Sequence, residues 1–128
     1  FSTWMMLEGA WHSVFSERAP IIPLEEYGQQ LDTIFETLTN AGVTQNVLLV
    51  GWTPLEDYPN LYTQEIYNQY REKSREVARK RNIPIIEFTT ELKGLSLEQA
   101  FVGEHQIHLS AIGHRRIASS ILKVLNES

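Results

Sequence analysis

Apolar side chains between residues 24 and 38 recur at three- and four-residue steps, which is the period of an amphipathic helix. Glu25 and Glu26 stand in the first turn, where the helix dipole favours acidic groups, and Pro23 suits that turn because its missing N–H is no loss there. Gly42 can adopt the left-handed conformation that ends a helix. The pattern therefore predicts a helix from Pro23 to about residue 41. Its apolar stripe consists of Leu24, Tyr27, Leu31, Ile34, Phe35 and Leu38.

Three short apolar runs have the length of β-strands. The central run, residues 46–51 (Asn-Val-Leu-Leu-Val-Gly), is apolar on both faces, which is typical of a parallel strand that is covered on both sides. An earlier run, residues 4–7, ends at Glu8 and Gly9, and a later run occupies residues 83–88. Their length and the flanking glycine favour strand over helix.

Two further helices are predicted after the central strand. The first covers residues 64–81 and ends at Asn82, and the second is capped by Ser110 and runs toward the C-terminus. The inner side of the first consists of Ile66, Tyr70, Val77 and Ala78. The inner side of the second consists of Ile117, Ile121, Leu122 and Leu125.

The segment between these helices carries weaker signals. Ser96 and Gln99 have the spacing of a capping box, which predicts a short helical turn. Residues 103–109 are expected to form a loop. Gly113, in the first turn of the last helix, is interpreted as a close-packing glycine, and His114 is expected to be exposed.

The predicted order is strand, helix, strand, helix, strand, loop, helix. Such alternation indicates an α/β fold with a parallel sheet and helices on both faces. We expect residues 1–128 to form a single domain, because the chain has the length of one domain and no linker or repeat. Three strands make a thin sheet, so at least one more strand is expected beside them.

Composition excludes several classes of function. The formal net charge of −5 argues against a nucleic-acid binder, which needs clustered Lys and Arg. Between residues 71 and 81, basic side chains alternate with Glu72 and Glu76, which is typical of a solvated helix face. No apolar run is long enough to span a bilayer.

The cysteine content and the N-terminal residues of the chain bear on its cellular location and its origin. The chain has no cysteine, which rules out a disulfide framework and fits an intracellular location, in the cytoplasm or an organelle matrix. It begins at Phe1 with neither an initiator methionine nor a signal-peptide pattern. We therefore expect a processed chain, a split gene product or a fragment.

Three segments, in this order, resemble the SGNH/GDSL ester hydrolases, in particular the branch of isoamyl-acetate-hydrolysing esterases. Residues 22–27 (Ile-Pro-Leu-Glu-Glu-Tyr) resemble the helix start that follows the third motif block of that family. Residues 47–54 (Val-Leu-Leu-Val-Gly-Trp-Thr-Pro) resemble its strand that runs into a proline-containing loop. Residues 108–114 (His-Leu-Ser-Ala-Ile-Gly-His) resemble the block of the catalytic histidine. The resemblance implies the C-terminal portion of a three-layer α/β/α, flavodoxin-like fold.

The family's chemistry defines what the site requires. A serine attacks the ester carbonyl, a histidine takes its proton, and an aspartate three residues before the histidine orients it. Donors from a backbone N–H, a glycine and an asparagine hold the developing oxyanion. The resemblance assigns His108 to the catalytic base.

Several positions depart from this pattern. The position three before His108 holds His105, which cannot supply a permanent negative charge, so Glu104 would have to orient the base. The third block, Gly-x-Asn-Asp in the family, reads Gly9-Ala10-Trp11-His12, so Trp11 replaces the oxyanion asparagine. The Gly-Asp-Ser block and the N-terminal strand before it are absent from this chain. Losing the triad's acid costs about ten-thousandfold in rate, and losing one oxyanion donor costs roughly a hundred- to thousandfold.

The relict pocket, defined as Gly9, Trp11, His12 and His105, is open to more than one interpretation. Trp11 would either form an aromatic wall for an apolar ligand or fill the redundant site, and we favour the second. The histidines together with Glu104 could suit zinc, but the Glu-His-x-x-His spacing is not that of the helical zinc motif. We predict a polar, partly solvated cluster without a metal or other cofactor.

The hypothesis that follows is a non-catalytic subunit of hydrolase ancestry with a structural or assembly role. An exposed edge of a parallel sheet is normally covered, so another chain or an N-terminal segment is expected to cover it, within a multi-subunit complex. One alternative is a split carboxylester hydrolase, with His108 as base and the serine supplied by another segment or chain. Another is a small-ligand or metal-binding module on the relict pocket.

Overall fold

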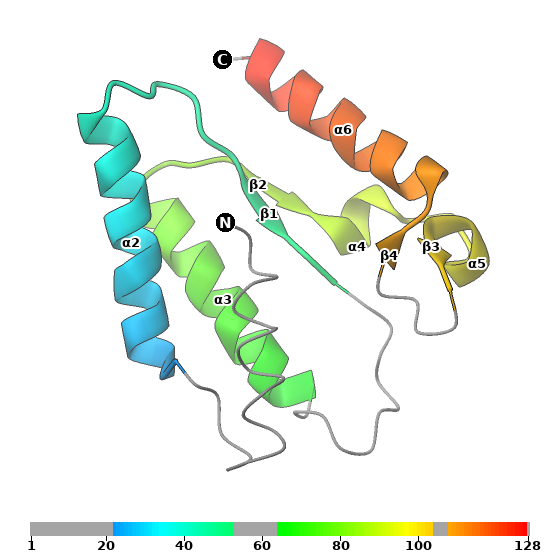
Figure 1. Cartoon of the computed structure of the whole chain (residues 1–128), viewed down its shortest axis with the longest axis horizontal. Coiled ribbons are helices and arrows are strands. Elements are labelled where there is room, and N and C mark those ends of the chain that lie inside the picture. Colours follow the sequence, from blue (N-terminus) through cyan, green and yellow to red (C-terminus); the bar gives the residue numbers. More distant parts are fainter. Residues whose placement is uncertain (1–21, 53–63, 104–107, 128) are drawn as a thin grey trace.

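The computed structural model of the protein describes residues 22–52, 64–103 and 108–127. Its elements follow in the order α2 (Leu24–Asn40), β1 (Leu48–Val50), α3 (Gln64–Lys80), β2 (Ile85–Glu87), α4 (Phe88–Glu91), α5 (Leu97–Ala100), β3 (Phe101–Val102), β4 (His108–Leu109) and α6 (Ala111–Asn126) (Figure 1). The strand predicted at residues 4–7 lies outside the described residues. So do five candidate site residues: Gly9, Trp11, His12, Glu104 and His105.

The strands β1 and β2 form a parallel pair, as the apolar runs predict. Leu48 lies opposite Ile85 and Val50 opposite Glu87, and the Leu48 N–H donates to the Pro84 carbonyl at 2.9 Å. The helix α3 contacts β1 and α6 contacts β2, and Figure 1 shows them on opposite sides of the pair. The mixed α/β class with a parallel sheet is therefore confirmed. The flavodoxin-like strand order remains a prediction, because it needs more parallel strands than β1 and β2, the two in the described part of the chain.

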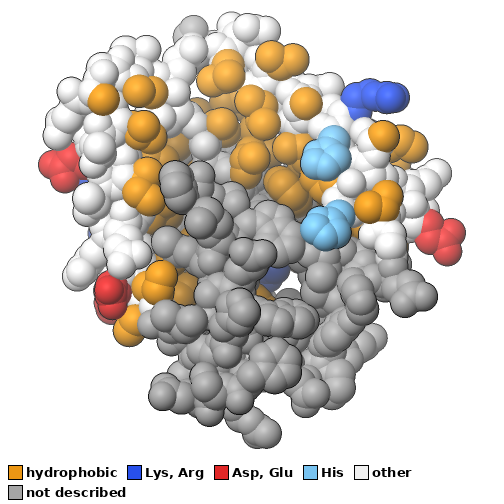
Figure 2. Space-filling model, in the orientation of Figure 1, with side chains coloured by type: hydrophobic (Ala, Val, Ile, Leu, Met, Phe, Trp, Pro, Cys, Tyr) orange, Lys and Arg blue, Asp and Glu red, His pale blue; other side chains and the backbone are white. Residues whose placement is uncertain are grey.

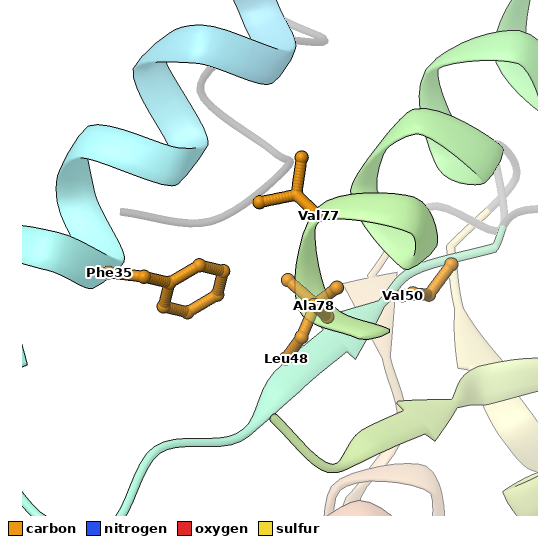
Figure 3. Packing of buried hydrophobic residues seen from close by; sticks show 5 residues of the cluster. All are labelled: Phe35, Leu48, Val50, Val77 and Ala78. Atoms are coloured by element: carbon orange, nitrogen blue, oxygen red, sulfur yellow. The ribbon is translucent and has the colours of Figure 1, made fainter. Parts of the chain in front are cut away.

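A hydrophobic cluster joins α2, α3 and β1. Phe35 of α2 points toward α3, while Leu48 and Val50 of β1 lie beside Ala78 (Figure 3). Ala78 is fully buried, and its small side chain lets α3 lie close to the strand. Each large apolar side chain buried in this way stabilises the fold by roughly 1.5–3 kcal/mol.

Polar contacts add to the packing of α2 on α3. The hydroxyls of Tyr27 and Ser74 form a hydrogen bond of 2.6 Å inside the interface, where both side chains are almost fully buried. Arg81, just beyond α3, makes two hydrogen bonds to the carboxylate of Asp32 on α2, at 2.6 and 3.0 Å. These contacts fix the rotation of one helix against the other.

The helix ends agree closely with the sequence signals. Gly42 after α2 and Asn82 after α3 both have positive φ angles, of 86° and 54°, as expected of residues that end helices. Ser96 forms the predicted capping box with Gln99, and the Ser110 hydroxyl caps α6. Pro23 is an exception, because it is the N-cap residue of α2 and stands before the first turn.

Other expectations were wrong in detail. Phe88 begins the helical turn α4 instead of ending a strand, and residues 108 and 109 of the expected loop pair antiparallel with β3. Such short elements leave no periodicity in a sequence. Ile34 and Leu122, predicted to face inward, are 38% and 61% exposed, because each helix contacts its neighbours over a narrower stripe than its apolar pattern covers.

Candidate functional site

A second hydrophobic cluster holds the short β3–β4 pair at the end of β1. Trp52 follows β1 and packs against Phe101 of β3, with ring centroids 6.0 Å apart. Leu109 of β4 packs on the same cluster, whose buried members are Leu92, Ala100 and Phe101. The pair is therefore attached to the edge of the sheet where β1 ends, and this edge is where ligands bind in open α/β sheets.

Ser110 fastens the end of β4 to the end of α5. Its N–H donates to the Ala100 carbonyl at 2.8 Å, and its hydroxyl donates to the Gln99 carbonyl. The same hydroxyl oxygen accepts the N–H of Gly113 at 3.0 Å, which caps α6. These bonds fix the backbone that follows His108 on two sides.

Gly113 lets α6 start close to this backbone. A Cβ atom at this position would lie 2.5 Å from the Ala100 carbonyl oxygen and 3.1 Å from the Leu109 side chain. The first distance leaves no room for a methyl group, and the carbonyl belongs to backbone that is itself hydrogen-bonded to Ser110; the second would require the Leu109 side chain to shift by a few tenths of an ångström. The interpretation of Gly113 as a close-packing glycine is confirmed.

His108, the position assigned to a catalytic base, lies on β4 opposite Val102, and its side chain is exposed. His114 is exposed in the first turn of α6, as predicted. Figure 2 shows both of these histidines on one face, beside an apolar area that lies between α2 and α6. The structure thus presents the His108 imidazole to solvent from a well-anchored strand. Its relation to Glu104 and the relict pocket involves residues outside the described ranges.

Arg71 is a candidate residue that sequence analysis missed. It falls in the run interpreted as a solvated helix face, yet it is only 8% exposed. Its Nε–H donates to the Gly51 carbonyl at 3.0 Å, directly after β1, and its guanidinium lies 5.7 Å from the centre of the Tyr67 ring. Burial lowers the pKa of Arg71 from its usual value, and the positive charge of Arg75 lowers it further. The alternation of charges gave no sign of this, because it does not show which side of α3 meets the strand.

The neighbouring basic residues of α3 are all paired. Arg75 makes a two-bond contact with Glu87 at the end of β2, at 2.6 and 3.1 Å, and also contacts Glu72. These hydrogen bonds raise the pKa of Arg75, and those from Arg75 and Arg79 lower the pKa of Glu72. The network ties α3 to β2 and leaves Arg71 as the buried cation of this region.

Within the described ranges, no three His, Asp or Glu side chains are grouped closely enough to hold a metal ion. None of the helices in the described part of the chain is both long and apolar enough to cross a membrane.

Comparison with known proteins adds information about the fold. No model of a known protein family matches the sequence, and no curated protein matches it. Three chains of solved structures match, among them LAE5, described as an alpha/beta hydrolase enzyme from the metagenome of Lake Arreo, Spain. The match has 20% sequence identity and a TM-score of 0.64, and covers 94% of this chain but 53% of LAE5. The chain thus spans about half the length of LAE5, and at this level of identity the likeness shows a hydrolase-like α/β fold.

Proposed function

We propose that this chain is the C-terminal portion of an SGNH/GDSL-like, three-layer hydrolase domain that has lost ester hydrolysis and acts as a non-catalytic subunit. The observation that carries the proposal is the histidine at position 105, where the resembling family has the aspartate that orients the catalytic base. Two imidazoles three residues apart offer no fixed negative charge to stabilise a protonated His108. The hydrolase-like fold and the anchoring of His108 at the end of β1 support the ancestry.

The magnitude of the loss favours a non-catalytic role. Loss of the carboxylate that orients the base lowers the rate of ester hydrolysis about ten-thousandfold. Loss of the oxyanion donor lowers that rate roughly a hundred- to thousandfold, although the two effects overlap. In the sequence, Trp11 holds the position of the family's oxyanion asparagine, and an indole at that position would fill the space that an acyl group needs. Either change alone lowers the rate of hydrolysis too far for a useful esterase.

The proposal is tested with short-chain acyl esters and the full-length protein in its native assembly. We expect no hydrolysis above the rate of the His108→Ala variant. The double variant His105→Asp, Trp11→Asn restores both family residues. The double variant His105→Asn, Trp11→Asn is its control, and the difference between their hydrolysis rates measures the contribution of the carboxylate at position 105. Hydrolysis by the unmodified protein that His108→Ala abolishes would overturn the proposal.

A split hydrolase is the second candidate, and the exposure of His108 at the end of β1 favours it. In this function His108 is the base, Glu104 orients it, and another segment or chain supplies the serine. A fluorophosphonate probe should then label a co-purifying serine, and Glu104→Gln should lower kcat with little change in KM. Absence of any labelled serine in the native assembly would end this candidate.

The partner is part of the same proposal. We infer that another polypeptide, or a segment preceding Phe1, covers the sheet edge in a larger assembly. Native isolation followed by mass spectrometry tests this inference. A partner chain at constant stoichiometry, or a longer form of this chain, is expected, and a native monomer that consists of residues 1–128 alone would contradict the inference.

A further inference from the structure

Arg71 is the most buried arginine among the described residues, and only part of its hydrogen-bonding capacity is used. A guanidinium carries five N–H groups. In the described part of the chain, one donates from Nε to the Gly51 carbonyl at 3.0 Å and one from Nη1 to the Asn68 side-chain oxygen at 3.1 Å. The remaining N–H groups sit on the two terminal nitrogens, which form the fork that binds paired oxygens.

Among the described residues, no carboxylate makes an ion pair with Arg71. Within the described ranges, no Asp or Glu oxygen lies within 4.0 Å of it, whereas Arg75 and Arg81 each make two hydrogen bonds to one carboxylate. Glu87 attracts Arg71 from a longer distance, but the repulsion from Arg75 is the larger of the two effects. Arg75 and Arg81, which are more exposed, are therefore each paired with a carboxylate, whereas the described residues offer no such partner to Arg71.

The unused end of Arg71 remains reachable. Among the described residues, no side-chain nitrogen or oxygen is both fully enclosed and without a hydrogen-bond partner. The terminal nitrogen of Arg71 for which the described residues provide no acceptor is therefore not fully enclosed. Its position is set by the bond to Gly51, at the end of β1, and Trp52 follows directly.

We propose that Arg71 binds an anionic group that presents two oxygens, a carboxylate or a phosphate, at the edge of the sheet where β1 ends. A buried cation without a counter-charge is costly, and a bound anion offsets that cost. The bond to Gly51 alone does not explain the residue, since a neutral donor would make it without the cost of burying a charge. This site goes beyond the proposed loss of hydrolysis and does not depend on it.

The experiment is an NMR titration of the full-length protein with sodium acetate and, separately, sodium phosphate, with NaCl holding the ionic strength constant. The signals followed are the Arg71 Nε–H and the backbone amides of Gly51 and Trp52. The matched variants are Arg71→Lys and Arg79→Lys, the same change on the same helix. Arg79 is largely exposed and paired with Glu72.

We expect saturable shifts of these signals with at least one of the two ions. Affinity should fall roughly tenfold or more in Arg71→Lys, the effect of losing one charge-assisted hydrogen bond, and stay unchanged in Arg79→Lys. Saturation by acetate alone identifies a carboxylate ligand and saturation by phosphate alone a phosphorylated one. No saturable shift of the Arg71 Nε–H with either ion overturns the proposal, as does an equal loss of affinity in Arg79→Lys. The measurement on the unmodified protein decides the matter even if Arg71→Lys does not fold.

Discussion

Replacing Gly113 by alanine tests how closely the start of α6 packs against the Ala100 carbonyl at the end of α5. The new Cβ would lie 2.5 Å from the Ala100 carbonyl oxygen, while ordinary contact begins at 3.4 Å, so α6 or the end of α5 must move by about 0.9 Å (3.4 − 2.5). Such overpacking costs roughly 1–3 kcal/mol. The same carbonyl accepts the Ser110 N–H, and weakening that bond adds about 1 kcal/mol.

An opposing effect must be subtracted. Alanine is favoured over glycine in a helix interior by about 1 kcal/mol, and by less in the first turn, where Gly113 stands. The net expectation is a loss of roughly 1–3 kcal/mol in the free energy of unfolding, measured by urea denaturation.

Gly28→Ala is the matched control for this prediction. It is also a helical glycine, but its nearest neighbours would be Cδ and Cγ of the Lys73 side chain at 2.8 and 3.0 Å, which can rearrange more readily than a hydrogen-bonded backbone carbonyl. We expect Gly28→Ala to be neutral or stabilising by up to about 1 kcal/mol. If Gly113→Ala is as stable as Gly28→Ala, the close approach of α6 to Ala100 is not present in the protein and the reasoning fails.

Three further predictions concern single contacts. Ser110→Ala should destabilise the protein by about 1 kcal/mol through loss of the α6 cap, whereas Ser119→Ala on the exposed side of the same helix should not; equal urea midpoints for the two would contradict the cap. Tyr27→Phe removes the hydrogen bond to Ser74 and should cost about 1 kcal/mol in thermal or urea unfolding, an effect that would be absent if the two hydroxyls do not meet. Hydrogen bonding to Arg81 lowers the pKa of Asp32 from its usual value of 3.8, so its contribution is present above that pH and is lost as the pH falls through the lower folded value. The urea midpoints of the unmodified protein and Asp32→Asn should therefore differ at pH 6 and converge toward pH 2, and a difference independent of pH would refute the pairing.

Local signals in the sequence determined the long helices and the parallel pair. The stripe around Tyr27 and Phe35, the caps at Ser96 and Ser110, and the residues that end helices act within one or two turns, so neighbours in the chain suffice to specify them. A run that is apolar on both faces likewise specifies a covered strand wherever it lies. The histidine block could be placed before the last helix for the same reason.

Tertiary packing decided the parts on which the candidate sites depend. Arg71 is buried because α3 turns that side toward Gly51, a contact twenty residues away that no charge pattern encodes. His108 lies in a strand because Leu109 packs on the cluster of Trp52 and Phe101. Both are long-range contacts, and the residues next to a side chain in the sequence do not specify which distant surface it packs against. The sequence by itself thus determined the long helices and the parallel pair, whereas only the packing of those elements decided the short strands and which polar residues are buried at the end of β1.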